Sequence, residues 1–332
     1  MKKLESVFSK KILILINLAF LVLIVLLARI VFSKDDLKSR YDIVHDENSY
    51  YSLTNPILDC ELENGQNDNS IIYTDKINNE IDKLKSQYGV KHVSLYFRDL
   101  NNGLWLGINE KEDFSPASLL KVPVLIAFLH QAETDPLLLE KKITILPSDI
   151  NQIIRPNIIS SEDHLIVGNE YTLLEIARRM IQKSDNDAVL VLLRNIKKSY
   201  IEDIFKSIGL QFKGTADENL ITVKDYAGFF RILFNASYLD REMSELALEI
   251  LSGSEYKDGI VAGVPKDIVI AHKFGERSIN GNVDIQLHDC GVVYYPDKPY
   301  IICIMTRGND FKQQEKLISD LSKYVYQEVN NN

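Results

Sequence analysis

The chain reads Asp113-Phe-Ser-Pro-Ala-Ser118-Leu-Leu-Lys121 immediately before an apolar run that ends at Ala132. The apolar spacing predicts a buried helix over 117–132, with Ser118 and Lys121 just inside its start. Residues three apart on a helix share one face, so a partly desolvated Lys121 amine is suited to accept the proton of the Ser118 hydroxyl. The Ser118 backbone N–H would point out of the helix N-terminus, where it can stabilise a developing oxyanion.

Two further motifs follow this pair along the chain, namely Ser184-Asp-Asn186 and Lys273-Phe-Gly275. Each motif alone has an ordinary structural explanation: a serine at a helix start, a serine-aspartate helix cap, and a lysine on a strand. A second Ser-x-x-Lys match, Ser254-Glu-Tyr-Lys257, has no apolar helix behind it and is interpreted as chance. The three motifs in this order, each in a suitable predicted element, are therefore stronger evidence for an active site than any one of them alone.

The three motifs in this order resemble the Ser-x-x-Lys, Ser-Asp-Asn and Lys-Thr-Gly signature of class A β-lactamases and penicillin-binding proteins. The resemblance covers roughly residues 75–329. Four further blocks belong to it: residues 93–110, Gly168-Asn-Glu-Tyr-Thr-Leu, Ala271-His-Lys-Phe-Gly-Glu and His288-Asp-Cys-Gly-Val-Val. The resemblance implies a β-lactamase/transpeptidase-like fold and a serine hydrolase that needs no cofactor.

The same resemblance assigns catalytic roles to four residues. Ser118 would attack a carbonyl and form an acyl-enzyme, with Lys121 as its base. Ser184 would relay a proton to the leaving nitrogen. Lys273 would hold the Ser184 hydroxyl and the substrate carboxylate by its charge.

Substrate binding is assigned to three more positions. Asn186 would position the substrate amide. The backbone N–H of Glu276, next to Gly275, would complete the oxyanion hole together with the N–H of Ser118.

The third motif departs from the family pattern, because Phe274 stands where the family has threonine or serine. The hydroxyl that would donate to the substrate carboxylate is therefore missing, and the phenyl ring is expected to crowd the site. Arg277 and Ser278 follow closely and are the candidates for a replacement donor.

A second departure concerns the loop between the second and third motifs. True class A β-lactamases carry Glu-x-x-Leu-Asn there, and its glutamate activates the water that frees the enzyme. Here residues 208–222 form a shorter stretch whose one glutamate is Glu218, in Glu218-Asn-Leu220. Glu218 is thus the candidate base, with an ordinary surface residue as the alternative. Without a placed base, deacylation should be slower than acylation.

Hydrophobic periodicity predicts strands near both ends of the domain and helices between them. Strands are expected at 92–97 and 104–108, around the turn Asn101-Asn-Gly, and again at 268–274, 291–295 and 300–305. Predicted helices fall at 77–88, 117–132, 172–183, 187–193, 225–234, 243–251 and 313–329. This order predicts an α+β domain in which N- and C-terminal strands share one antiparallel sheet.

The N-terminal region predicts a membrane anchor. Residues 12–32 are almost entirely apolar and would extend roughly 25–30 Å as a helix, enough to span a bilayer. Lysines precede it, which favours a cytoplasmic segment 1–11, a polar linker at 33–70 and an extracytoplasmic domain at 71–332. A cleaved signal peptide is the alternative, although its apolar stretch should be shorter and end in small residues. The expected location is a single-pass protein of the cell membrane.

Charge and composition exclude several partners. The net charge is −9 for the chain and +5 for residues 1–40, which leaves −14 for the remainder. Nucleic acid and anionic lipid surfaces are therefore not expected partners of the domain. The six histidines show no metal-binding spacing, so no metal is expected, and the domain is expected to be a monomer.

The three cysteines, Cys60, Cys290 and Cys303, are an odd number and predict no disulfide framework. If the turn Pro296-Asp-Lys-Pro299 is the centre of a hairpin, Cys290 faces residue 305. Cys290 and Cys303 are therefore predicted to be two separate core thiols.

Three functions fit these patterns. The first is hydrolysis of β-lactams through a Ser118 acyl-enzyme. The second is an acyl hydrolase or transferase acting on cell-wall D-alanyl peptides, with slow deacylation. The third is a retired, membrane-tethered penicillin-binding or sensing domain in which Phe274 has closed the site. The intact set of motif residues favours an enzyme.

Overall fold

The computed structural model describes residues 51–56, 68–150, 164–210, 213–215, 218–279 and 284–331. The predicted anchor at 12–32, the segment before it and most of the predicted linker lie outside these residues. Within the described ranges, no helix has the length and hydrophobicity needed to cross a membrane.

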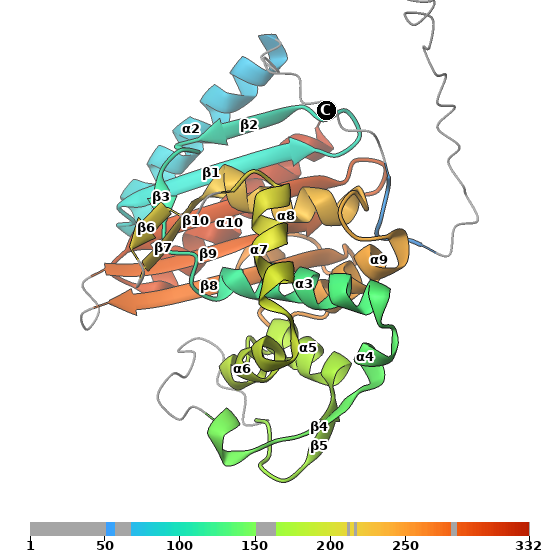
Figure 1. The fold of residues 1–332 in the computed structure, drawn as a ribbon. Coiled ribbons are helices and arrows are strands. Elements are labelled where there is room, and N and C mark those ends of the chain that lie inside the picture. Colours follow the sequence, from blue (N-terminus) through green and yellow to red (C-terminus); the bar gives the residue numbers. More distant parts are fainter. Residues whose placement is uncertain are drawn as a thin grey trace, which may run out of the picture. The chain divides into compact units, whose positions relative to one another are not determined.

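A five-stranded antiparallel sheet forms the centre of the domain, with the strand order β2-β1-β10-β9-β8 (Figure 1). Its strands are β1 (His92–Asp99), β2 (Trp105–Ile108), β8 (Ile270–Ile279), β9 (Asp284–Val293) and β10 (Tyr300–Gly308). The first and last strands of the domain pair directly, because β1 lies beside β10. The predicted α+β arrangement, with N- and C-terminal strands in one sheet, is confirmed.

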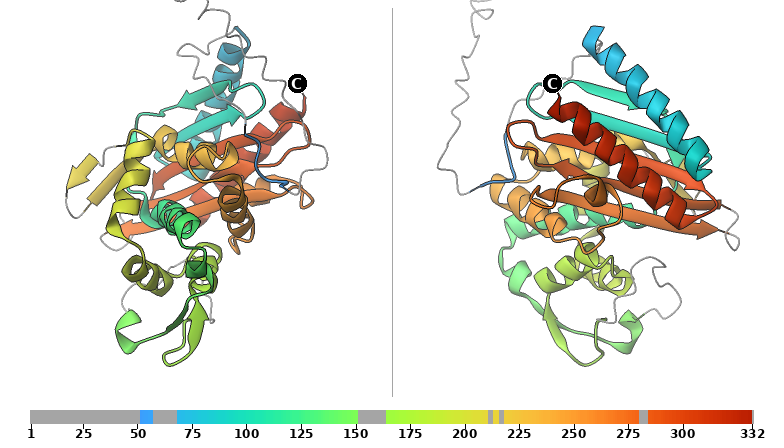
Figure 2. Two further views of the ribbon diagram at one scale, coloured as in Figure 1. Left: turned by 45° about the vertical axis from the view of Figure 1, so that its right-hand side comes forward. Right: turned by 180° about the vertical axis from the view of Figure 1, so that it is seen from behind.

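Helices cover both faces of this sheet. Two of them, α2 (Asp68–Tyr88) and α10 (Phe311–Asn330), pack against each other and cover one face (Figure 2). Helices α8 (Val223–Phe234) and α9 (Arg241–Ser252) pack on the other side, where α8 contacts β1, β9 and β10. The sheet therefore separates two hydrophobic cores, one under each helical layer.

The second helical layer extends into a group of helices away from the sheet (Figure 1). These are α3 (Lys121–Thr134), α4 (Leu137–Glu140), α5 (Leu173–Gln182), α6 (Asn186–Asn195) and α7 (Lys198–Ser207). Helix α3 runs through the centre of the group, and every side chain from Val122 to Leu129 is buried. Helix α7 was not predicted, although Ile201, Ile204 and Phe205 have helical spacing.

Several short elements complete the domain. The 3₁₀ turns are η2 (Ala117–Leu120), η3 (Pro147–Asp149) and η4 (Ile260–Gly263). Strands β3 (Asp113–Phe114), β7 (Glu218–Thr222) and β6 (Lys213–Thr215) form a small sheet, and β4 (Lys142–Thr144) pairs with β5 (Glu170–Thr172). Strands β3, β4, β5 and β6 have two or three residues each, which is too few for an alternating sequence pattern to reveal them.

The prediction of separate core thiols is wrong, because Cys290 and Cys303 form a disulfide. The hairpin turn is closed by a hydrogen bond from the Lys298 N–H to the Tyr295 carbonyl, one residue earlier than the prolines suggest. This register places Cys290 directly opposite Cys303 on β9 and β10. Directly opposite residues on antiparallel strands are close enough for their sulfurs to bond.

Residues 51–56 fall within the predicted linker and lie on the domain. The Glu245 carboxylate on α9 accepts hydrogen bonds from the backbone N–H groups of Ser52, Leu53 and Thr54 at 2.7, 2.7 and 2.9 Å. The Tyr294 hydroxyl donates to the Leu53 carbonyl at 2.9 Å. This short segment is therefore attached to the helical layer that contains α9.

Candidate active site

Ser118 lies in the 3₁₀ turn η2, half-buried, and Lys121 begins α3 directly behind it. The Lys121 Nζ and Ser118 Oγ atoms are 3.0 Å apart, as the helical spacing predicts. Ala117, the residue before Ser118, has φ +48°, a left-handed conformation that costs a non-glycine residue energy. The nucleophile candidate therefore sits on a strained turn that holds its side chain against the amine.

Lys121 Nζ also contacts residues of the second motif. It lies 2.6 Å from the Ser184 carbonyl oxygen and 2.7 Å from Asn186 Oδ1. A neutral amine has two N–H donors and one lone pair. The two carbonyl oxygens can only accept, so they use both donors, and the lone pair faces the hydroxyls of Ser118 and Ser184, each 3.0 Å from Nζ.

The protonation of Lys121 suits this role. Burial lowers the pKa of the Lys121 amine to about 7, although the charges of Asp185 and Glu276 oppose part of this effect. A substantial fraction of the amine is consequently neutral near pH 7. This pKa brings Lys121 into the range in which a general base is effective.

Ser184 lies between α5 and α6 and is buried. Its φ of +53° places it in the left-handed region, and the next residue, Asp185, caps α6 by accepting from two backbone N–H groups. The Ser184 Oγ atom is 3.0 Å from Lys121 Nζ and 3.0 Å from Lys273 Nζ. The hydroxyl thus lies between two amines and links them.

Lys273 comes from β8, the edge strand of the large sheet, and is fully buried. Besides Ser184, its Nζ contacts the Phe274 carbonyl at 3.0 Å and lies 4.1 Å from the centre of the Phe274 ring. Burial and the nearby Lys121 charge lower the pKa of Lys273 well below its usual value. The two amines therefore resist carrying a full charge at the same time.

The expectation that the Phe274 ring crowds the site is not what the structure shows. The ring is completely buried in the core shared with α2 and α10, where it stacks on Tyr256 with the ring centres 4.3 Å apart. The face of the ring lies against the Lys273 amine, and the ring does not reach the solvent. The missing hydroxyl nevertheless remains a real difference from the family motif.

Gly275 permits the close approach of β8 to the turn that carries Ser118. A Cβ atom at this position would lie 2.9 Å from the Pro116 carbonyl oxygen and 3.1 Å from the Leu119 nitrogen. Backbone atoms cannot easily move away, so a larger residue would displace the strand or the turn. The contact places the backbone of β8 at Gly275, beside Glu276, against the segment that contains the Ser118 N–H.

The remaining candidates lie around this centre. Arg277 is half-buried and donates a hydrogen bond to the Ser115 hydroxyl, whereas Ser278 is exposed further along β8. Glu218 begins β7, opposite Thr215 in the β6–β7 hairpin. This hairpin lies between the second and third motifs along the chain, and β7 pairs with β3 just before the Ser118 turn.

Sequence reasoning missed several residues that hold the turn. The Tyr226 hydroxyl of α8 donates to the Leu119 carbonyl at 3.0 Å, and Gln286 and His288 of β9 contact the backbone of Ser115. His288 belongs to one of the family blocks, but the resemblance implies no role for it. Gln286 and His288 are two residues apart, so on a strand their side chains point to the same face. This spacing is the signal that could have suggested a joint function.

Three features define the active-site serine hydrolases with the β-lactamase/transpeptidase fold. These are a Ser-Lys pair at the start of a buried helix, a second serine on an adjoining loop, and a second lysine on the edge of an antiparallel sheet. A profile of the beta-lactamase enzyme family matches residues 75–329. The chain belongs to this family.

Individual proteins resemble the chain in sequence or in fold. The chain is 25% identical to beta-lactamase VEB-1 of Pseudomonas aeruginosa over 289 residues, which cover 79% of this chain and 91% of that protein. The fold matches a class A beta-lactamase from Mycobacterium abscessus with a TM-score of 0.65 at 20% identity, covering 76% of this chain and 99% of that one. A variant of PBP-A, in an acyl-enzyme complex with penicillin G, matches with a TM-score of 0.64 at 24% identity, covering 77% and 97%.

Proposed function

We propose that this protein is a serine acyl hydrolase that reacts with β-lactams or related amides through an acyl-enzyme on Ser118. The observation that carries the proposal is the continuous series of polar contacts from Ser118 through Lys121 and Ser184 to Lys273. Each step is 3.0 Å, which is a distance at which a proton can pass between the atoms.

Acylation follows from this geometry. The neutral Lys121 amine takes the proton of the Ser118 hydroxyl while the oxygen attacks the substrate carbonyl carbon. The backbone N–H groups of Ser118 and Glu276 stabilise the oxyanion, and Asn186 holds the substrate amide. When the carbon–nitrogen bond breaks, the leaving nitrogen receives a proton from the Ser184 hydroxyl, which is replenished from the flanking amines.

Lys273 is the proposed partner of a substrate carboxylate. Its low pKa in the empty site reflects burial and the neighbouring Lys121. A carboxylate arriving beside it would favour the charged form and raise the pKa of Lys273. Arg277 and Ser278 are the proposed donors in place of the hydroxyl that Phe274 lacks, and the half-buried position of Arg277 favours it over the exposed Ser278.

Deacylation is proposed to be the slow step. The β6–β7 hairpin lies between the second and third motifs, the part of the sequence in which the family pattern has the loop whose glutamate activates the hydrolytic water. Glu218 is the one glutamate of this segment. A long-lived acyl-enzyme fits a protein that processes D-alanyl peptides of the cell wall, and this is the second candidate function. The PBP-A variant that forms an acyl-enzyme with penicillin G has a similar fold.

We further propose that residues 12–32 anchor the protein in the cell membrane and that the domain is a monomer outside it. The apolar character of this segment and the lysines before it support the anchor. Protease protection of the domain in intact cells would contradict the proposed orientation, whereas cleavage at exposed sites would support it.

A chromogenic cephalosporin tests the proposed activity. The full chain, purified in detergent, should show a rapid burst of about one equivalent of opened ring, followed by slow turnover, because acylation precedes a slower deacylation. Ser118→Ala should show neither phase. Absence of both phases from the unaltered protein would contradict β-lactam reactivity, and fast turnover without a burst would contradict slow deacylation.

A further inference from the structure

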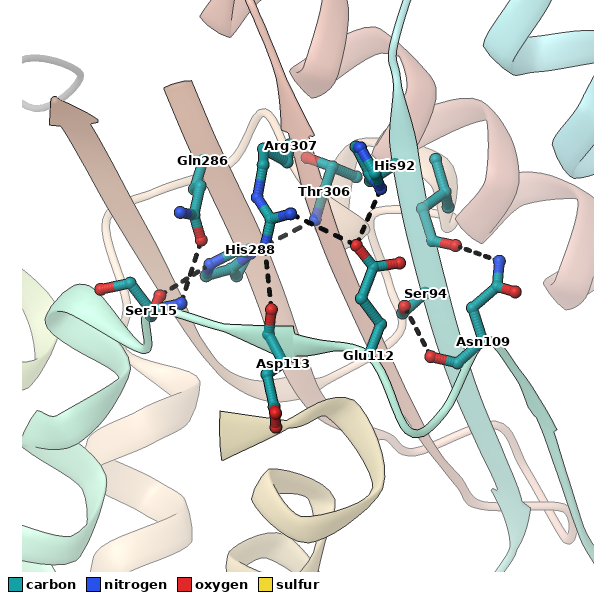
Figure 3. Close-up of polar contacts among 11 residues, drawn as sticks. His92, Ser94, Asn109, Glu112, Asp113, Ser115, Gln286, His288, Thr306 and Arg307 are labelled. Carbon is teal, nitrogen blue, oxygen red and sulfur yellow. Dashed lines mark hydrogen bonds and ion pairs between the residues drawn. The ribbon is translucent and has the colours of Figure 1, made fainter. Parts of the chain in front are cut away.

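Three side chains hold Ser115, which lies three residues before Ser118. The Ser115 N–H donates to Gln286 Oε1 at 3.0 Å, its carbonyl lies 2.9 Å from His288 Nε2, and its hydroxyl accepts from Arg277. Figure 3 shows the Gln286 and His288 contacts converging on Ser115. Ser115 is itself buried, so its backbone has both of its polar groups bonded to side chains from β9.

The surroundings of the His288 ring determine which of its nitrogens carries the hydrogen that is donated to Ser115. Its Nδ1 accepts from the Thr306 N–H at 3.3 Å, so the ring hydrogen is on Nε2 and is donated to the Ser115 carbonyl. Burial lowers the pKa of His288 to about 4, which keeps the ring neutral with this single hydrogen at ordinary pH. The ring also packs edge-on against Phe114, with the centres 5.4 Å apart.

Residues 112–114, which precede Ser115, also contact side chains of the large sheet. Arg307 donates to the Asp113 carbonyl at 2.8 Å (Figure 3). Its guanidinium lies 4.9 Å from the centre of the Phe114 ring. Glu112 is paired with His92 at 2.8 Å. The segment entering the nucleophile turn is therefore attached to the sheet at each residue from 112 to 115.

The turn that carries Ser118 is strained, so its conformation depends on the contacts that attach it to the sheet. Ala117 is left-handed, and the residue before η2, Pro116, provides no side-chain cap to the turn. A strained residue persists only when its surroundings over-determine its conformation. The Tyr226 hydroxyl fixes the far end of the turn at the Leu119 carbonyl, and the contacts on Ser115 fix the near end.

We propose that Gln286 and His288 are positioning residues for the acylation of Ser118, because they hold Ser115 and so maintain the strained turn that orients the Ser118 hydroxyl and N–H. This inference rests on the proposed acyl-enzyme function and deepens it. Neither side chain is assigned contact with the substrate; both act through the backbone of Ser115.

Paired variants separate positioning from general stability. Gln286→Met removes the acceptor, whereas Gln286→Glu keeps an oxygen in its place opposite Arg277. His288→Phe removes the donor and keeps a ring, whereas His288→Gln restores a donor near Nε2. Ser94→Ala is the matched control, because it deletes another hydrogen bond of a buried serine, 2.8 Å from Ser94 Oγ to the Asn109 carbonyl, without touching the contacts of Ser115 itself.

The rate constant for modification of Ser118 is measured in the full chain with two probes, a fluorescent penicillin and a small fluorophosphonate. Gln286→Met and His288→Phe should slow both reactions on the order of 10–100-fold, since small misplacements of a reacting group have effects of this size. Gln286→Glu and His288→Gln should recover most of the rate. Ser94→Ala should react like the unaltered protein even where its melting temperature falls equally.

The outcomes are decisive in both directions. Unaltered rates in a folded Gln286→Met or His288→Phe protein overturn the proposal, as does an equal loss of rate in Ser94→Ala. If one of these variants does not fold, the other decides. An unaltered protein that reacts with the fluorophosphonate but not with penicillin contradicts the β-lactam function alone, and the fluorophosphonate rates still test the positioning. An unaltered protein that reacts with neither probe contradicts both.

Discussion

The pH dependence of Ser118 acylation should reveal the titration of Lys121. If the neutral amine is the base, the rate follows the fraction of Lys121 that has lost its proton. With a pKa of about 7, this fraction is roughly 9% at pH 6 and roughly 91% at pH 8. Acylation should therefore rise about tenfold between these values and reach a plateau above about pH 8.

An ordinary lysine predicts a different curve. With the usual lysine pKa of about 10.4, the neutral fraction would grow about a hundredfold from pH 6 to pH 8 and would continue to rise beyond pH 9. The plateau, more than the slope, therefore distinguishes a buried base from an exposed amine. Stopped-flow measurement of fluorescent penicillin labelling over pH 5.5–9.5 records the whole curve.

A charge-removing variant provides the control. The carboxylate of Asp185 raises the pKa of Lys121 against the effect of burial. Asp185→Asn removes this charge and retains a good helix cap for α6, so the inflection of the curve should move to lower pH. A rate that rises without a plateau to pH 9.5, or an inflection that does not move in Asp185→Asn, would refute Lys121 as the titrating base.

Three further predictions follow from the surroundings of the site. Gly275→Ala should slow acylation by at least about tenfold, because its Cβ would meet the Pro116 carbonyl oxygen at 2.9 Å and displace the turn; penicillin labelling checks this, and an unchanged rate would contradict the close approach. Phe274→Thr should lower the free energy of unfolding by about 3 kcal/mol, since it empties a buried ring site stacked on Tyr256; urea unfolding measures this, and a loss below about 1 kcal/mol would count against the stack. Reducing the Cys290–Cys303 disulfide, whose sequence separation is 13, should cost about 3 kcal/mol, and thiol alkylation after unfolding without reductant should leave both cysteines unlabelled.

The long elements of the fold could be predicted because their sequence patterns agree with their environment. The Asn101-Asn-Gly103 turn, for example, is followed by a strand that pairs with the preceding one, and Gly103 has the expected positive φ of +73°. The side chains from Val122 to Leu129 in α3 are all buried and form an apolar run, as a central helix requires. Helices and strands of this length contain enough residues for periodicity to be decisive.

The pairing of the cysteines could not be predicted, because it depends on the register of one hairpin. A turn closed at Tyr295 and Lys298, instead of one centred between Pro296 and Pro299, shifts the partner of Cys290 by two residues. Two residues preserve the face of a strand but change the partner. No pattern in the sequence distinguishes the two turns.

The side chains named in the motifs could be predicted, but not the contacts that arrange them. The spacing of Ser118 and Lys121 indicated their shared face, whereas the contacts of Lys121 with Ser184 and Asn186 connect residues more than 60 positions apart. The environment of the Phe274 ring was also not predicted from the sequence, because its stacking on Tyr256 joins residues from separate elements.

Intact-mass spectrometry after incubation with penicillin G tests the central claim most directly. The full chain should gain the mass of one penicillin within the labelling time, peptide mapping should locate it on Ser118, and the adduct should persist long after free penicillin is removed. Ser118→Ala and Lys121→Ala should remain unmodified under the same conditions. An unmodified mass for the unaltered protein, or an adduct on another residue, would contradict the account.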